Sequence, residues 1–366
     1  MNADTSIAKP HYTNFLARLL LKNQFENQWI IPEPPAPLVN RMLRVIETYW
    51  LRVDTSDIRV DRPIFILSLP RCGSSMLQDI ICTLPQVCYT TNIMHTFRDC
   101  FCAAEYLRKK FGFNVRGERF LKDSIEVDGG SPADSVGTWA EWFKQDPFET
   151  DFSRTSEIRL NDEDKENIRE GIKRVIWSFG KEATRFECKT PALLPHARLL
   201  QEIFPDAKFI HLVRDARASA NSLLKLHRLT NEQLIAIRKR KGVPAPEAPF
   251  VPYPRLPKLQ SLLDSYGPDD IRTTAHLWNE GVDFIRQTRS ALTNFHEVRY
   301  EDILADPDKE IFKLIDFCEL PRPGTDNKKF RDKIGGVGVV HHKNRYGDFS
   351  VIEEICRDNM QRFGYL

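Results

Sequence analysis

The sequence predicts an α/β fold in which a central parallel sheet carries helices on both faces. Short apolar segments rich in β-branched residues alternate with segments of helical spacing along most of the 366-residue chain. Two of these strand segments run directly into polar loops that open helices, and ligands in such folds bind at the carboxyl ends of the strands. We expect strands near residues 63–68, 185–189, 208–213 and 295–300, and helices near 75–84, 193–203 and 217–228.

The first 60 residues or so are expected to form a helical N-terminal extension, followed by one domain over residues 61–366. Tyr12–Leu21 and Leu38–Ile46 carry apolar residues at helical spacing, and the proline-rich run 31–37 separates them. A segment of this kind packs on the main domain or contacts another subunit. The sequence is therefore compatible with a homo-oligomer formed through the N-terminal helices.

The first strand–loop–helix segment is Pro63–Leu77, where an apolar run breaks at Pro70 and a short polar loop follows. Free backbone N–H groups and a helix N-terminus in this arrangement can receive a phosphate. The loop lacks the Lys-Ser/Thr pair with which a Walker A sequence holds a triphosphate and magnesium. The alternative is a plain connection in which a serine caps the helix. The candidate nucleotide-binding residues of this loop are Arg71, Cys72, Gly73, Ser74, Ser75 and Met76.

The second such segment is Ala207–Leu224. Its apolar part, Phe209–Val213, reads as a buried strand, and Arg214 and Asp215 follow it directly. A helix then begins, with Ser222 eight positions after Arg214. This segment, like the first, places polar side chains at the end of a predicted strand.

Together the two loops resemble those of sulfotransferases that use 3′-phosphoadenosine 5′-phosphosulfate (PAPS), in particular the bacterial-type and tyrosylprotein branch. In that family a P-R/K-S-G-[ST]-[ST] loop takes the 5′-phosphosulfate, and an R-[DN]-x-R-x-x-x-x-S segment takes the 3′-phosphate. The chain departs from the first pattern only at Cys72, a position that mainly contributes backbone. The resemblance implies a P-loop-like sulfotransferase fold, PAPS as co-substrate and no metal.

Further matches follow in the family's order. Lys189, before Thr190-Pro191, resembles the lysine placed near the bridging oxygen of the donor. Tyr300 lies in an R-Y-E-D segment and is a candidate nucleotide contact, and the tail ending at Gly364-Tyr365 resembles the family's last helix. The glycine-rich segment 335–345 resembles the loop that closes over the nucleotide, which makes Lys343 and Arg345 candidate contacts.

Sulfuryl transfer requires an acceptor that loses a proton and a leaving oxygen whose growing charge is stabilised. Lys189 and Arg71 are the candidates for stabilising that oxygen. In cytosolic family members the base is a histidine of a K-T-H segment, where this chain has Pro191. In tyrosylprotein and related bacterial members it is a glutamate roughly ten residues after the proline that ends the loop helix. The corresponding window here, residues 89–95 after Pro85, contains no acid. His95 is the only competent base in that window and is the predicted general base, with His196 as the second choice.

The composition excludes several classes of protein. The 53 basic and 51 acidic residues argue against general nucleic-acid binding or a polybasic membrane role. No apolar run reaches the roughly 20 residues of a membrane span, and the first ten residues lack a signal-peptide pattern. The eight cysteines show no C-x-x-C spacing, which favours reduced thiols in a cytoplasmic protein.

Two insertions, residues 90–184 and 229–268, interrupt the alternation and are expected to form the acceptor pocket or a lid. The function predicted is transfer of a sulfuryl group to a hydroxyl or amine of an unidentified acceptor, expected to be a small molecule. Two alternatives stay open: a P-loop-type nucleotide kinase, and a non-catalytic nucleotide-binding protein on the same fold.

Overall fold

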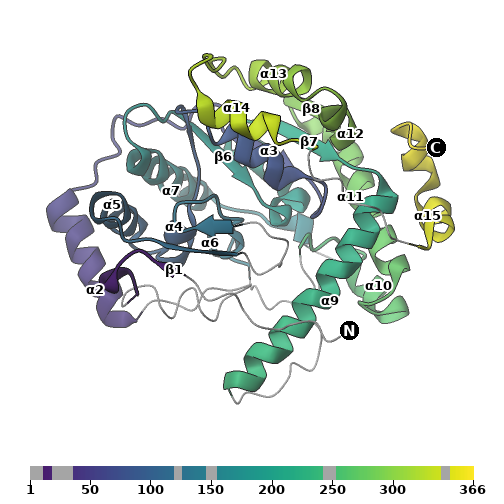
Figure 1. Cartoon of the computed structure of the whole chain (residues 1–366), viewed down its shortest axis with the longest axis horizontal. Helices are drawn as coiled ribbons and strands as arrows, with labels where there is room; N and C mark the ends of the chain where they lie inside the picture. The colour runs from purple at the N-terminus through teal and green to yellow at the C-terminus, as the bar shows by residue number, and fades with distance from the viewer. Residues whose placement is uncertain (1–10, 19–35, 119–125, 146–154, 242–252, 339–346) are drawn as a thin grey trace.

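The computed structural model describes residues 11–18, 36–118, 126–145, 155–241, 253–338 and 347–366. Its centre is a five-stranded sheet of order β3-β6-β2-β7-β8, in which every neighbouring pair is parallel (Figure 1). The predicted α/β fold with a central parallel sheet is confirmed. The strands are β2 (Ile64–Leu67), β3 (Val87–Cys88), β6 (Arg185–Lys189), β7 (Lys208–Val213) and β8 (Asn294–Arg299).

The sheet is covered on both faces, as the continuous apolar character of its inner strands requires. Alternate residues of β2 point to opposite faces, so that Phe65 and Leu67 enter one core cluster while Ile64 and Ile66 enter another. The first cluster includes helices α7 (Asp162–Phe179), α8 (Ala197–Ile203), α9 (Ala216–Lys241), α11 (Ile271–Thr288) and α15 (Phe349–Arg362). The second includes α3 (Ser74–Ile81), α12 (Tyr300–Ala305), α13 (Pro307–Phe317) and α14 (Lys328–Gly335).

Two predicted helices differ from those observed. The expected helix 193–203 begins as a 3₁₀ segment, η3 (Pro191–His196), and becomes α8 only at Ala197. Pro195 lies inside η3, and its missing N–H prevents regular α-helical hydrogen bonding there. The expected helix 217–228 continues to Lys241 as α9, so the basic run 238–241 lies at the end of this helix.

The N-terminal segment also differs from its prediction. Residues His11–Tyr12 form strand β1, which pairs antiparallel with β4 (Val115–Glu118), and β4 pairs with β5 (Glu126–Asp128). Helical structure begins only at Phe15. The expectation of a helix from Tyr12 was wrong because the edge of β4 offers these residues backbone partners, a tertiary effect that local spacing does not show.

The second predicted N-terminal helix forms as α2 (Pro37–Val45), continued by the π-helix η1 (Ile46–Leu51). Their inner side packs on α4 (Asn92–Thr96) and α5 (Phe101–Phe111) in a third core cluster. The N-terminal extension thus rests on the first insertion, which also contains α6 (Val136–Trp142) and η2 (Thr155–Glu157). The second insertion contributes the later part of α9 and α10 (Leu259–Tyr266).

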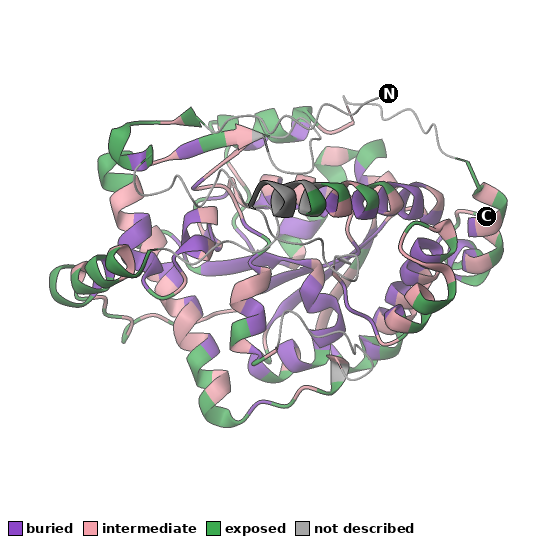
Figure 2. Ribbon diagram, turned by 90° about the horizontal axis from the view of Figure 1, so that it is seen from below, coloured by how far each residue is buried: buried purple, intermediate pink, exposed green. Residues whose placement is uncertain are grey.

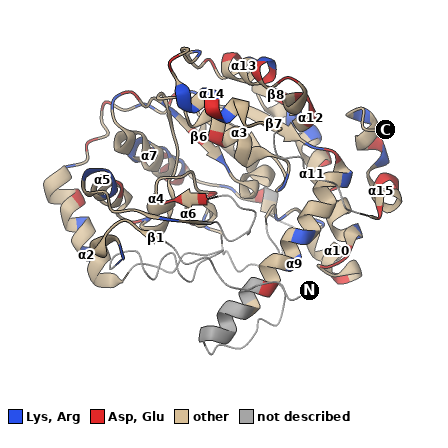
Figure 3. Cartoon of the chain, in the orientation of Figure 1, with Lys and Arg blue, Asp and Glu red and all other residues tan. Residues whose placement is uncertain are grey.

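The distribution of burial and charge follows these layers. In Figure 2 the strands of the central sheet are mostly buried, whereas the outer sides of the surrounding helices are exposed. Figure 3 shows acidic and basic residues spread over many elements. All eight cysteines are free, and seven of them are buried. Among the described residues, no helix is both long enough and apolar enough to cross a membrane.

Candidate active site

The loop between β2 and α3 is shaped for a close approach of backbone to ligand. Gly73 has φ +92° and stands immediately before the first residue of α3. A Cβ atom at this position would lie 2.3 Å from Cδ2 of Tyr300, so a larger residue cannot occupy it without moving that ring. Glycine is therefore required both by the left-handed backbone and by the ring of Tyr300. Ser74 is buried, and Ser75 and Met76 are half-buried on the first turn of α3.

Arg71 connects this loop to the second predicted phosphate site. Its Nε donates a hydrogen bond to Oγ of Ser222 at 3.0 Å, and its carbonyl accepts one from Nη1 of Arg214 at 3.0 Å. The two loops meet because β2 and β7 are adjacent parallel strands, with Leu67 opposite His211. Arg71 itself has φ +70°, an unusual conformation for a residue with a side chain, and such strain is concentrated at functional sites.

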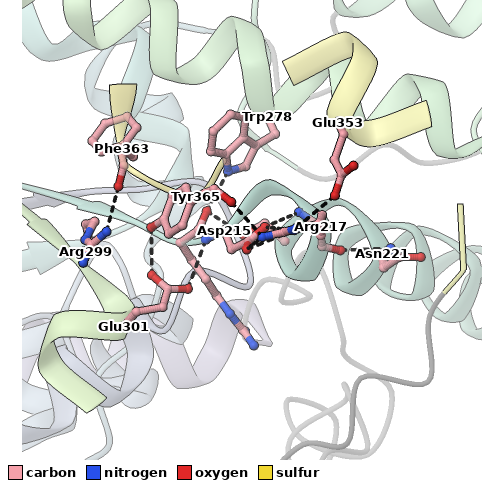
Figure 4. A network of polar contacts seen from close by, with 11 residues as sticks. Asp215, Arg217, Asn221, Trp278, Arg299, Glu301, Glu353, Phe363 and Tyr365 are labelled. Atoms are coloured by element: carbon pink, nitrogen blue, oxygen red, sulfur yellow. Dashed lines mark hydrogen bonds and ion pairs between the residues drawn. The ribbon is translucent and has the colours of Figure 1, made fainter. Parts of the chain in front are cut away.

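The guanidinium of Arg214 lies over the ring of Tyr300, 4.8 Å from its centroid. The carbonyl of Arg214 accepts a hydrogen bond from Nε1 of the buried Trp278 at 3.0 Å, which fixes the backbone from which this side chain extends (Figure 4). Five predicted nucleotide-binding residues are thus brought together from three strand ends. They are Arg71, Gly73, Arg214, Ser222 and Tyr300.

Cys72 belongs to the first core cluster. Its side chain is buried, and its Sγ lies 3.6 Å from Oγ of Ser219. Burial raises the pKa of the thiol to about 11, so it stays protonated and unreactive at neutral pH. Cys72 therefore contributes backbone to the loop, as the sequence suggested for this position.

Arg217, the second arginine of the R-D-x-R segment, has a structural role. It forms ion pairs with Asp215 and with Glu353 of α15, and it donates to the carbonyl of Tyr365 at 3.1 Å (Figure 4). The hydroxyl of Tyr365 in turn donates to Glu301, whose other oxygen accepts the backbone N–H of Asp215. This ring of contacts fastens the end of the chain to the loop after β7.

Lys189 lies at the end of β6, opposite Ile66 of β2, and is buried. Its Nζ contacts Oδ1 of Asp134, which lies in the loop between β5 and α6. Backbone hydrogen bonds hold this loop against residues 89–95, the window that contains His95 and no acid. The N–H of Ala133 donates to the carbonyl of Thr90, and a β-bridge joins Thr91 to Pro132. Asp134 thus places a carboxylate beside Lys189 that sequence reasoning missed.

His95 lies on α4 and is half-buried, with Nδ1 3.3 Å from Oγ1 of Thr138. Burial and, to a smaller extent, the nearby charge of Arg98 lower its pKa to about 4, and the charge of Asp134 opposes part of this shift. The imidazole is therefore neutral at pH 7 and able to accept a proton. Asp134 is close enough to act electrostatically on His95 while it contacts Lys189.

His196 has a different environment. Its ring is buried, lies 4.9 Å from the ring of Phe143, and has its pKa lowered by burial to about 3. A histidine enclosed in this way packs in the core and is a poor second choice for the base. Lys343 and Arg345 lie outside the described residues.

A small apolar cavity of about 10 Å³ lies beside His95 and shares Thr138 with it. Its lining comes from α4, α5, α6 and α7, the helices of the first insertion. The lining residues are Thr90, Met94, Arg98, Phe101, Thr138, Trp142 and Val175.

Comparison with known proteins identifies the family to which the chain belongs. The model of the sulfotransferase family matches residues 63–240 and 254–324, more than half of the chain. The chain belongs to the sulfotransferase family: it is an enzyme that transfers a sulfuryl group, with PAPS as the donor. Both groups of predicted phosphate-binding residues lie within the matched ranges.

Two curated relatives illustrate the range of the family. The omega-hydroxy-beta-dihydromenaquinone-9 sulfotransferase Stf3 of Mycobacterium tuberculosis is 25% identical over 338 residues, covering 84% of this chain and 80% of the relative. Protein-tyrosine sulfotransferase A of Caenorhabditis elegans is 21% identical over 193 residues, covering 52% of this chain and 37% of that protein.

Solved structures support the fold. Sulfotransferase STF9 from Mycobacterium avium gives a TM-score of 0.52 at 14% identity, covering 88% of this chain and 81% of that one. Sulfotransferase STF1 from Mycobacterium tuberculosis gives 0.50 at 13% identity, covering 88% and 83%.

Proposed function

We propose that this sulfotransferase acts on a hydroxyl group of a small molecule, with the donor held across the two loops that Arg71 joins. The observation that carries the proposal is the pair of contacts from Arg71 to Ser222 and from Arg214 to Arg71. These contacts hold two anion-binding loops together at adjacent strand ends, at the edge of the sheet where ligands bind in parallel α/β folds. PAPS carries phosphates at both ends of its ribose and suits such a double site.

The backbone N–H groups of Gly73 to Ser75 and the N-terminus of α3 would hold the 5′-phosphosulfate. Arg214 and Ser222 would hold the 3′-phosphate, and the ring of Tyr300, already packed on Gly73 and Arg214, would line the nucleotide site. Contacts from Lys343 and Arg345 stay predictions, as does metal-independent binding.

In the reaction, the acceptor oxygen forms a bond to sulfur while the bond from sulfur to the bridging phosphate oxygen breaks. The acceptor proton passes to a protein base, and the nucleotide leaves as the anion 3′-phosphoadenosine 5′-phosphate (PAP). Lys189 and Arg71 would stabilise the charge that grows on the bridging oxygen. Burial of Lys189 supports this role because a cation acts more strongly where water is excluded.

His95 remains the predicted base, and Asp134 is a second candidate from the first insertion. The neutral imidazole supports His95, although a pKa of about 4 makes it a weak base. The contact with Lys189 supports Asp134, since a base and the group that stabilises the leaving oxygen must flank the same sulfur. Substitution of each residue in turn distinguishes the two candidate bases.

One comparison, and not the cavity beside His95, supports an apolar acceptor that carries a hydroxyl group, since that cavity of about 10 Å³ has room for no more than about one water molecule. The relative Stf3 is named for an omega-hydroxy menaquinone, an apolar molecule with one hydroxyl. Placement in the cytoplasm, and a homo-oligomer formed through the N-terminal helices, stay predictions for this chain.

Isothermal titration with PAP and with adenosine 5′-phosphate, in the presence of EDTA, tests the double phosphate site. PAP should bind at least tenfold more tightly, because a charge-assisted contact contributes about 1.5–3 kcal/mol. Arg214→Ala and Ser222→Ala should remove most of that preference. Arg357→Ala, on an exposed side of α15, is the matched control and should retain it. Equal affinity for the two nucleotides in the wild type would contradict the proposal, and a requirement for magnesium would favour the kinase alternative.

A further inference from the structure

An exposed apolar surface covers the outer side of the N-terminal helices. Seven of the eleven large hydrophobic side chains that are exposed among the described residues lie between residues 11 and 51. A concentration of this kind marks an interaction surface, because single exposed hydrophobic residues are normally scattered. The N-terminal apolar face, as we name it, is formed by Leu38, Met42, Val45, Tyr49 and Trp50.

The spacing of these residues places them on one side of the helix formed by α2 and η1. Leu38, Met42, Val45 and Tyr49 follow one another at intervals of four, three and four residues. Leu38 is 69%, Tyr49 74% and Trp50 72% exposed. In Figure 1, α2 lies at the left edge of the molecule, on the far side of α5 from the central sheet.

The opposite side of the same helix is already used by the fold. Leu43 is buried, and Ile46 packs with it against Ile93 and Phe97 of the first insertion. Glu47 is buried as well and pairs with Arg174 of α7. The helix is therefore fixed in orientation, and its apolar face is held outward by packing on the inner side.

The charges around this face are basic. Arg41, Arg44 and Arg52 are exposed, and Glu47, the only acidic residue between positions 36 and 53, is turned inward. Asp99 pairs with Arg44. Arg41 and Arg52 have no carboxylate within ion-pair distance among the residues that the structure describes. The net charge beside the apolar side chains is positive.

We propose that the N-terminal apolar face docks the protein on an anionic lipid surface. The aliphatic and aromatic side chains would enter the boundary between headgroups and acyl chains, with the arginines at the level of the lipid phosphates. Tyr49 and Trp50 suit this boundary because their rings combine an apolar body with one polar group. The balanced charge of the whole chain does not oppose this, since electrostatic attraction is screened beyond about 8 Å at physiological salt.

A second copy of the chain fits this face less well. A symmetric dimer buries the same surface of both partners, which here brings the arginines of both copies around one apolar patch. Residues 36–53 contain no exposed acid to compensate them, Asp99 already pairs with Arg44, and the next exposed acid along the chain is Asp54. Like charges facing each other oppose such an interface, whereas lipid phosphates complement both parts of the surface.

Co-sedimentation of the full chain with lipid vesicles tests the proposal without donor or acceptor, so its outcome is independent of the proposed reaction. The protein should bind vesicles of phosphatidylcholine mixed with phosphatidylglycerol, bind pure phosphatidylcholine more weakly, and lose affinity as salt is raised. The double variants Tyr49→Ser/Trp50→Ser and Arg41→Glu/Arg52→Glu should each weaken binding about tenfold or more.

Matched controls replace exposed residues outside the face. Leu304→Ser removes an exposed hydrophobic side chain of α12, and Arg357→Glu reverses an exposed charge of α15. Both should bind vesicles as the wild type does, and circular dichroism should show all four variants folded. Failure of the wild type to bind anionic vesicles, or equal binding by all variants, would overturn the proposal. A concentration-dependent dimer that Tyr49→Ser/Trp50→Ser abolishes, without vesicle binding, would assign the face to a second copy instead.

Discussion

Glu187 should make the stability of this protein decrease as pH rises, and Glu187→Gln should remove that dependence. The carboxyl lies on β6, two residues before Lys189, and is fully buried. One oxygen accepts hydrogen bonds from Gln78 at 2.9 Å and from the thiol of Cys82, while the other has no hydrogen-bond partner among the described residues. Its pKa is raised from 4.5 to about 7, because the effect of burial outweighs that of these donors and of the charge of Lys189.

The sign follows from which state binds the proton more tightly. The folded protein keeps Glu187 protonated up to about pH 7, whereas the unfolded chain releases the proton near pH 4.5. The contribution to stability is fully present below pH 4.5 and is lost as pH rises through 7. At about 1.4 kcal/mol per pKa unit, the loss for this one group is about 3 kcal/mol.

Urea unfolding followed by tryptophan fluorescence at intervals from pH 5 to pH 8 measures this effect. The free energy of unfolding of Glu187→Gln, relative to the wild type, should rise by about 2.5 kcal/mol between pH 5 and pH 8, because glutamine retains an oxygen for Gln78 but never ionises. Glu354→Gln, on the exposed side of α15, controls for the loss of one carboxylate. If the stability curves of wild type and Glu187→Gln run parallel with pH, the inferred protonation of the buried carboxyl is wrong.

Three further predictions concern the active site. The variants His95→Ala, Asp134→Asn and His196→Ala identify the base. The variant that removes it should show a single-turnover rate about 10²–10⁴-fold below wild type with PAP affinity retained. We expect His196→Ala to affect only the stability of the protein. Lys189→Ala should lower kcat with little change in PAP affinity, because its interaction strengthens as charge develops; a change in affinity alone would refute that role. Gly73→Ala should weaken PAP binding at least tenfold in calorimetry, since the ring packed on this loop must move; wild-type affinity would show that the loop adapts.

The central sheet could be predicted because its inner strands are buried on both faces and read as continuous apolar runs. Strand β3 could not, since Val87–Cys88 is too short to show a pattern. The spacing of apolar residues also failed to predict secondary structure at two places where a proline or a tertiary contact determines the backbone conformation. Pro195 imposes a 3₁₀ segment within an apparent helix, and pairing with β4 draws His11–Tyr12 into a strand.

The donor loops could be located from sequence because each is a contiguous motif at the end of a recognisable strand. Asp134 could not, since its contact with Lys189 joins residues 55 positions apart. That contact depends on the pairing of the loop after β5 with Thr90–Asn92, and no local pattern reports such a pairing. The one available signal was that residues 85–95 contain no acid, which led to His95 as the predicted base and left an acid from another segment as the alternative.

The segment Arg214-Asp215-Ala216-Arg217 assigns separate tasks to its two arginines. Arg214 lies against Arg71 and Tyr300 at the proposed nucleotide site, whereas the guanidinium of Arg217 is fully engaged by Asp215, Glu353 and Tyr365. Charge-assisted hydrogen bonds are about twice as strong as neutral ones. Because the guanidinium of Arg217 makes all of these contacts, it links the loop after β7 to α15 and to the end of the chain. The position of Arg214 therefore depends on α15 and on the last residues of the chain. The C-terminal helix, although distant in sequence from both loops, is thereby a structural part of the proposed nucleotide site.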